Sequence, residues 1–263
     1  MKQYRLCEIA DNPWFPDTLR NLMTDILGFI IVTYRIYEPV IPLIKEAMRQ
    51  MKTTQVIDLC SGNSGPWSQM QAQLQEQQES VSVTLTDKYP NLQAFEKIKE
   101  RSGGKIQYIP EAVDAANVPA YLKGMRTIFS AFHHFEPDAA KTILQNAVNS
   151  RSAIGIFEFS EKRLDKIFFA LLLPLFVFFV TPFIKPITFK RILWTNIIPI
   201  VPLVFTYDAI ISYATTYSPE DLKKLVEGID AQGYVWKIGQ VPSKLRTVRI
   251  TYLIGFPKEP HNA

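Results

Sequence analysis

Residues 56–67 read VIDLCSGNSGPW, and this stretch indicates the fold of the chain. It begins as a short apolar strand and continues into small residues that include two glycines. Glycine lets a ligand approach the main chain closely, and the N-terminus of a following helix offers unpaired N–H groups to a negatively charged group. The stretch therefore predicts a ligand site in a cleft at the carboxyl end of a strand.

Strands and helices alternate after this stretch. Beyond the first strand at 55–59, we expect strands at 81–86, 105–109, 126–132 and 153–159, with helices between them that include a short one near 118–122. Strands that alternate with helices pair in parallel through right-handed crossovers. Two more strands, at 234–241 and 246–256, follow each other without a helix, so we expect an antiparallel hairpin. The sequence predicts an α/β fold with a seven-stranded, mostly parallel sheet and a reversed last strand.

Three aspartates stand at the ends of successive predicted strands. Asp58 lies just inside the end of the first strand, Asp87 at the tip of the second and Asp114 just beyond the third. Open α/β sheets place a carboxylate on ribose hydroxyls at such a strand tip. Each aspartate alone could instead cap the next helix. The ordered set of three predicts a site for a nucleoside cofactor.

The stretch departs from the dinucleotide-binding pattern G-x-G-x-x-G, because Cys60 stands in the place of the first glycine. VIDLCSGNSG instead resembles the first motif of class I S-adenosylmethionine-dependent methyltransferases, usually V-L-D-L-G-x-G-x-G. The resemblance covers residues 56–159 and the closing hairpin. Cys60 and Ser64 stand where family members often have glycine, and Gly65 lies one position late.

This resemblance implies a Rossmann-like sheet in which strand seven lies antiparallel between strands five and six. It implies S-adenosyl-L-methionine as the cofactor, with Asp58 and the loop 61–65 at the methionine part, Asp87 at the ribose and Asp114 at the adenine. No metal site is expected. The expected cofactor-binding residues are Asp58, Ser61, Gly62, Asn63, Gly65, Asp87, Lys88, Asp114, Ala115 and Ser130.

The fourth predicted strand runs into SAFHHFEPD, which brings Ser130, His133 and His134 to the ligand edge of the sheet. Methyl transfer to a hydroxyl or an ammonium needs a base, and histidine suits that task near neutral pH. Neighbours at a strand end point in opposite directions, so His133 and His134 are alternative catalytic bases. Either ring could instead cap or pack against the next helix. Glu158, near the end of strand five, is a polar contact or a helix-capping acid.

A long apolar region follows strand five. Residues 167–184 carry no charge, and their 18 residues reach the lower limit for crossing a bilayer, but Pro174 and Pro182 would kink such a helix. A second apolar run, 192–214, contains Asp208. Three interpretations compete: a hairpin that crosses a membrane twice, helices that lie in the headgroup region, and helices that cover the active site or a partner copy. The basic residues that flank the two runs are Lys162, Arg163, Lys166, Lys185, Lys190 and Arg191.

Composition limits the class of protein. With 47% hydrophobic residues the chain is not disordered, and its net charge of +4 permits an anionic membrane surface as partner without demanding nucleic acid. The sequence has no Asn/Asp-Pro-Pro-Tyr motif after strand four, which also argues against nucleic acid. Only two cysteines and an N-terminus without an apolar signal region predict a cytoplasmic protein, peripheral or monotopic at a membrane.

Four regions are expected: N-terminal lid helices at 1–50, a cofactor-binding core at 51–160, the apolar insertion at 161–216, and a helix with the closing hairpin at 217–263. The predicted activity is methyl transfer from S-adenosyl-L-methionine to a hydrophobic small molecule or lipid-like acceptor, at a membrane surface. The rivals are a non-catalytic module that is recruited to membranes and a nicotinamide-dependent oxidoreductase.

Overall fold

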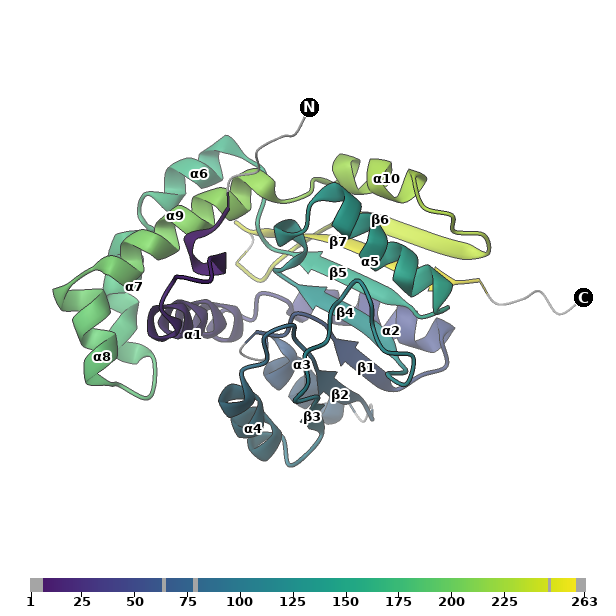
Figure 1. Ribbon diagram of the computed structural model, residues 1–263, viewed down its shortest axis with the longest axis horizontal. Coiled ribbons are helices and arrows are strands. Elements are labelled where there is room, and N and C mark those ends of the chain that lie inside the picture. Colours follow the sequence, from purple (N-terminus) through teal and green to yellow (C-terminus); the bar gives the residue numbers. More distant parts are fainter. Residues whose placement is uncertain (1–6, 63–64, 78–79, 246, 259–263) are drawn as a thin grey trace, which may run out of the picture.

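The computed structural model describes residues 7–62, 65–77, 80–245 and 247–258. They form one seven-stranded sheet with helices on both faces and a lobe of helices at its side (Figure 1). The strand order is β3-β2-β1-β4-β5-β7-β6. The strands are β1 (Gln55–Asp58), β2 (Ser82–Leu85), β3 (Ile106–Tyr108), β4 (Met125–Phe129), β5 (Ile154–Glu158), β6 (Tyr234–Pro242) and β7 (Arg249–Pro257).

Strand pairing confirms the predicted topology. Strands β1 to β5 pair in parallel, and β7 pairs antiparallel with both β5 and β6. The reversed last strand therefore lies between strands five and six, as the resemblance implies. Strand β1 is central, with Asp58 opposite Leu85 of β2 and Thr127 of β4. The carboxyl ends of β1, β2 and β4 consequently share one edge of the sheet.

Successive strand residues pack into different cores, because side chains alternate between the two faces of a sheet. Val56 belongs to the core under α2, α3 and α4, whereas Ile57 belongs to the core under α5 and α10. Both faces are covered, which explains why every residue of β4 and β5 is buried. These helices are α2 (Ile41–Gln50), α3 (Trp67–Glu76), α4 (Leu92–Arg101), α5 (Pro137–Asn149) and α10 (Pro219–Glu227). Ser218 caps the N-terminus of helix α10 and forms a capping box with Asp221.

The lobe beside the sheet joins the N-terminus to the apolar insertion (Figure 1). Its own core packs Ile26 of α1 against Val177 of α7 and Val201 of α9. The lobe contains η1 (Ile9–Asp11), α1 (Asp17–Thr33), α6 (Leu164–Ala170), α7 (Leu173–Val180), η4 (Thr181–Phe183), α8 (Phe189–Ile192), the π-helical turn η5 (Leu193–Ile197) and α9 (Ile200–Thr215). Two further short turns are η2 (Glu38–Val40) and η3 (Phe132–His134).

One local expectation is wrong, because residues 118–122 form turns and no helix. The uncharged run 167–184 is interrupted at its prolines, as expected: it is divided among α6, α7 and η4, with Pro174 in the first turn of α7 and Pro182 in η4. Proline cannot donate a helical hydrogen bond, so it starts short helices here instead of continuing a long one.

In the described part of the chain, no single helix has the length and apolar character needed to cross a membrane. Two bent helix pairs meet that test of length and composition together: Asp17–Thr33 with Glu38–Gln50, and Phe189–Ile197 with Ile200–Thr215.

Candidate functional site

The loop after β1 turns through left-handed backbone conformations. Cys60, Gly62 and Gly65 have φ values of 57°, 54° and 50°. Glycine adopts these values without strain, whereas a residue with a side chain rarely does. Cys60 therefore occupies a glycine-type position of the first motif, which explains the family's glycine there. The predicted contacts of Asn63 lie outside the described residues.

Asp58 is buried beneath this loop, with 1% of its surface exposed. Its Oδ2 accepts a hydrogen bond from Ser61 Oγ (2.7 Å), and its Oδ1 accepts from Thr127 Oγ1 (2.6 Å) and Trp67 Nε1 (3.0 Å). Burial raises the pKa of Asp58 to about 7, although these three donors oppose the rise. In the structure Asp58 and Ser61 hold the loop in place, and their expected contact with the methionine part stays a prediction.

Asp87 and Asp114 approach the same loop from β2 and β3. Asp87 accepts from the N–H groups of Gly62 (2.9 Å) and Tyr89 (2.8 Å), and Asp114 forms an ion pair with Lys88 (2.9 Å). The Cys60 thiol is half-buried, and burial raises its pKa, an effect to which the charges of Asp87, Asp58 and Asp114 add. The three strand-tip carboxylates thus gather around Cys60 at one edge of the sheet, the arrangement that the sequence predicted.

Two other expected residues lie at the edges of this region. Ala115 is buried in the same core cluster as Val113. Its side chain therefore points into the protein, whereas the side chain of its neighbour Asp114 is exposed. Ser130 follows β4 with a φ of 48°, and its hydroxyl forms a hydrogen bond with that of Tyr37. Tyr37, expected in a lid, is instead fully buried beneath the ends of β4 and β5, where it also donates to Phe157 O (3.3 Å).

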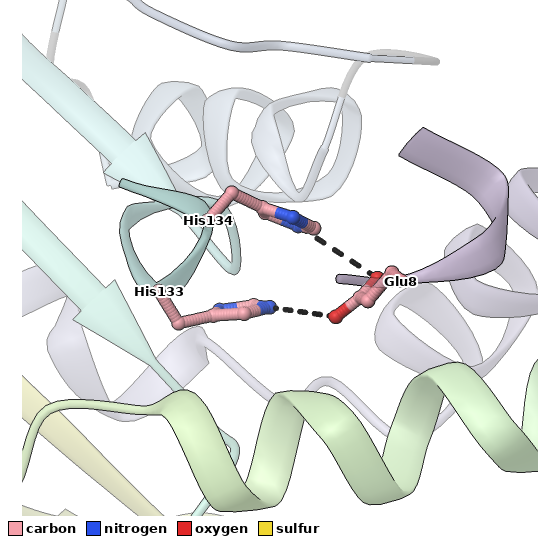
Figure 2. Close-up of side chains that lie close together, drawn as sticks. All are labelled: Glu8, His133 and His134. Atoms are coloured by element: carbon pink, nitrogen blue, oxygen red, sulfur yellow. Dashed lines mark ion pairs between the residues drawn. The ribbon is translucent and has the colours of Figure 1, made fainter. Parts of the chain in front are cut away.

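His133 and His134 lie side by side in η3, directly after β4 (Figure 2). Their ring centroids are 4.3 Å apart, and both Nε2 atoms face the carboxylate of Glu8. The expectation that these neighbours point in different directions is wrong, because alternation is a property of strands and η3 is a helical turn. Glu8, His133 and His134 are called the histidine cluster below.

A carboxylate holds each ring at its other nitrogen. His133 Nδ1 lies 2.8 Å from Glu158 Oε2, and Glu158 Oε1 also accepts from the N–H of Phe132 (2.8 Å). His134 Nδ1 lies 2.7 Å from Asp11 Oδ2. Burial lowers the pKa of His133, but Glu158 and then Glu8 outweigh burial and raise that pKa to about 10. Glu158 is thus a polar contact, and within the described residues the Nδ1 atom of each ring is held by a carboxylate and not by a backbone group.

The apolar insertion positions Glu8 against the histidines. On α9, Asp208 accepts from the N–H groups of Ile9 (2.6 Å) and Ala10 (3.1 Å), and Ser212 Oγ donates to Glu8 Oε1. The raised pKa of Asp208, about 6, comes from burial, which the two N–H groups oppose. Sequence reasoning missed Glu8 and Asp11, because no local pattern places the N-terminus beside strand four.

Comparisons with solved structures support the fold. No protein-family model and no curated protein matches the sequence. An O-methyltransferase family 2 protein from Planctomyces limnophilus, in complex with apigenin, is 13% identical over 94% of this chain and 63% of its own, with a TM-score of 0.53. The O-methyltransferase NcsB1 from neocarzinostatin biosynthesis, with S-adenosyl-L-homocysteine and 1,4-dihydroxy-2-naphthoic acid, is 12% identical over 92% of this chain and 59% of its own, with a TM-score of 0.52.

A structure from Rhodobacter sphaeroides, provisionally described as a Zn-dependent alcohol dehydrogenase, is 12% identical over 92% of this chain and 98% of its own, with a TM-score of 0.54. The chain spans about three fifths of the length of the two methyltransferases. Together with the strand order, these likenesses show that the chain has the Rossmann-like fold of class I S-adenosylmethionine-dependent methyltransferases.

Proposed function

We propose that the chain transfers the methyl group of S-adenosyl-L-methionine to a hydroxyl of an apolar small molecule at a membrane surface. The choice of cofactor is supported by the convergence of Asp58, Asp87 and Asp114 around the glycine-type loop at Cys60. A ribose diol bound there would be recognised by Asp87, the half-buried carboxylate at the tip of β2. Asp114 and Lys88 lie one strand further, where the adenine would be placed.

The acceptor side of the proposed site is the end of β4. Here the histidine cluster lies under the N-terminal segment, and His134, with 30% of its side chain exposed, is its accessible edge. Methyl transfer depends mainly on alignment of the acceptor atom with the methyl group. A hydroxyl must also lose its proton, and the predicted role of His133 and His134 as catalytic bases stays a proposal. Apigenin and dihydroxynaphthoic acid, the hydroxylated aromatic molecules in the similar folds, favour an acceptor of this class.

Membrane association is proposed from the surface of the lobe. Most of the exposed large apolar side chains in the described part of the chain lie between residues 168 and 207, where Phe168, Phe179 and Phe189 are 69%, 68% and 75% exposed. Lys185 and Lys190 are exposed among them, and such a mixture suits the headgroup region of an anionic bilayer. Arg191 cannot contribute to lipid binding as expected, because it is buried in an ion pair with Asp25.

The cofactor is tested by calorimetric titration of the full chain with S-adenosyl-L-methionine, S-adenosyl-L-homocysteine and NAD. We expect binding of both adenosyl compounds and none of NAD. Binding of NAD alone would instead support the oxidoreductase alternative. Binding of the adenosyl compounds without methyl transfer to any hydroxylated aromatic or lipid would support a non-catalytic module.

The membrane surface is tested by co-sedimentation with vesicles of phosphatidylcholine and phosphatidylserine. Replacing Phe168, Phe169 and Phe179 by serine should reduce the bound fraction at least tenfold, because about 2 kcal/mol is lost for each large apolar side chain that leaves the bilayer. Serine at the equally exposed Tyr89 and Tyr121 is the matched control. Point changes are preferred to deletion of the insertion, since α7 and α9 share a core with α1. Equal sedimentation of all variants would remove the membrane proposal.

A further inference from the structure

The histidine cluster brings together three side chains of the kind that bind transition metals. Glu8 comes from the N-terminal segment, and His133 and His134 come from η3 (Figure 2). One ligand atom from each lies within 4.8 Å of the other two. We propose that the histidine cluster binds one divalent transition-metal ion through the Glu8 carboxylate and the Nε2 atoms of His133 and His134.

The two histidines are oriented as metal ligands are. A metal-binding histidine usually donates a hydrogen bond from its second ring nitrogen to a carboxylate, which fixes the tautomer and the direction of the ring. Both rings have such a partner on Nδ1, Glu158 for His133 and Asp11 for His134. The Nε2 atoms are therefore the ones presented to a ligand, and both face Glu8 (Figure 2).

Within the described residues, His133 Nε2 makes no hydrogen bond and faces only the Glu8 carboxylate as an ion pair, although the His133 side chain is only 4% exposed. A buried polar atom without a partner costs free energy, and a bound metal ion would supply the partner that this nitrogen lacks. His133 Nε2 lies 3.4 Å from Glu8 Oε1, and His134 Nε2 lies 4.0 Å from Glu8 Oε2. Ligand atoms around a tetrahedral zinc ion are about 3.3 Å apart. Shifts of side chains alone would bring this set to that geometry.

The charges around the cluster favour a cation of charge two. The carboxylates of Glu8, Asp11 and Glu158 contact the two imidazoles, and Asp208 holds the N-terminal segment beside them. Two nitrogen ligands and one carboxylate suit zinc, cobalt, nickel or ferrous iron, whereas magnesium and calcium prefer oxygen ligands only. Three protein ligands also leave a coordination position open.

An ion at this place deepens the proposed methyl transfer, and this step alone rests on that function. With both Nε2 atoms bound to the ion, His133 and His134 would hold the ion instead of acting as bases. An acceptor hydroxyl in the open position would then lose its proton to water more readily, because a bound cation lowers the pKa of a coordinated oxygen. The new O–CH₃ bond then forms as the S–CH₃ bond breaks, and S-adenosyl-L-homocysteine leaves. The ion would also tie the N-terminal segment to the end of β4.

The test is titration of the full, untagged and chelator-treated protein with Co²⁺, followed by visible absorption, and then with Zn²⁺ as competitor. We expect one Co²⁺ per chain with absorption bands of a nitrogen- and oxygen-ligated ion, and no effect of Mg²⁺. At free Zn²⁺ a hundredfold above the dissociation constant, the melting temperature should rise by about 5–10 °C. No cofactor or acceptor is added, so the result is independent of the proposed methyl transfer.

Matched variants locate the ion. Glu8→Gln and His134→Ala should weaken Co²⁺ binding at least tenfold, and Asp11→Asn about tenfold through the orientation of His134. His261→Ala, the third histidine of the chain and outside the described residues, is the control and should bind as the native protein does. Thermal melts in chelator show that each variant is folded. Absence of stoichiometric binding, or equal binding by Glu8→Gln, His134→Ala and native protein, overturns the proposal.

Discussion

Replacing Asp58 by asparagine should stabilise the protein near pH 8 and leave its stability near pH 4 almost unchanged. Asparagine has the same shape, and its Oδ1 can accept from Thr127 Oγ1 and Trp67 Nε1 as Asp58 Oδ1 does. Its Nδ2 can donate to Ser61 Oγ, which still donates to the main-chain oxygen of residue 58 (2.9 Å). Every hydrogen bond is therefore kept, and only the buried charge is removed.

The magnitude follows from the pKa of Asp58. That pKa rises from an ordinary value of 3.8 to about 7 in the folded protein, mainly through burial. Between these two pH values the folded state binds the proton and the unfolded chain does not, so the free energy of unfolding falls as the pH rises. A pKa difference of about 3 units between the folded and unfolded states corresponds to about 4 kcal/mol of stability, and this stability is fully lost above pH 7. The asparagine of the variant does not titrate, so the variant keeps this stability above pH 7.

Urea denaturation of both proteins at pH 4.5, 6 and 8 measures the difference. Other titrating groups contribute equally to both proteins and cancel in the comparison. We expect the difference in unfolding free energy to grow by about 3–4 kcal/mol in favour of the variant from pH 4.5 to pH 8. A difference that stays constant with pH, or a variant that is less stable at pH 8, would refute the claim that Asp58 is buried and charged at that pH.

Two further changes probe the loop and its neighbours. Asp87→Ala should weaken S-adenosyl-L-methionine binding at least tenfold by calorimetry, since a charged hydrogen bond contributes about 1.5–3 kcal/mol. The control Glu227→Ala, at an exposed position, should have no effect. Equal affinities of Asp87→Ala and the native protein would remove the assignment of Asp87 to the ribose. Cys60 should react with iodoacetamide at pH 8 at least tenfold more slowly than the exposed Cys7, because partial burial and the nearby carboxylates raise the pKa of its thiol and lower the thiolate fraction. Mass spectrometry of the labelled peptides measures both rates, and comparable rates would contradict the raised pKa.

Local patterns were sufficient for the sheet. The alternation of apolar strands with helices predicted the parallel part, and the short connection between the last two strands predicted the hairpin of β6 and β7. Strand topology then required Asp58, Asp87 and Asp114 to meet, because parallel strands bring their carboxyl ends to one edge. The departure at Cys60 was also visible, and the left-handed backbone there explains why family members often have glycine at this position.

The acceptor side of the site was not predictable in this way. His133 and His134 were recognised, but a strand-based rule gave them different directions, and only the helical turn η3 shows that the two rings lie side by side. Their partner Asp11 lies 123 positions from His134 along the chain. Glu8 likewise reaches them because Ser212 and Asp208 of α9 hold the N-terminal segment.

The sequence by itself determined the strands, their order and the acidic tips of the sheet, because these depend on the side-chain period of each element and on the chemistry of neighbouring residues. Only the tertiary structure decided the histidine cluster, the burial of Tyr37 and Arg191, and the packing of the apolar helices α7 and α9 on α1. Those features depend on contacts between segments far apart in the chain, and no local pattern encodes which distant segment supplies the contact.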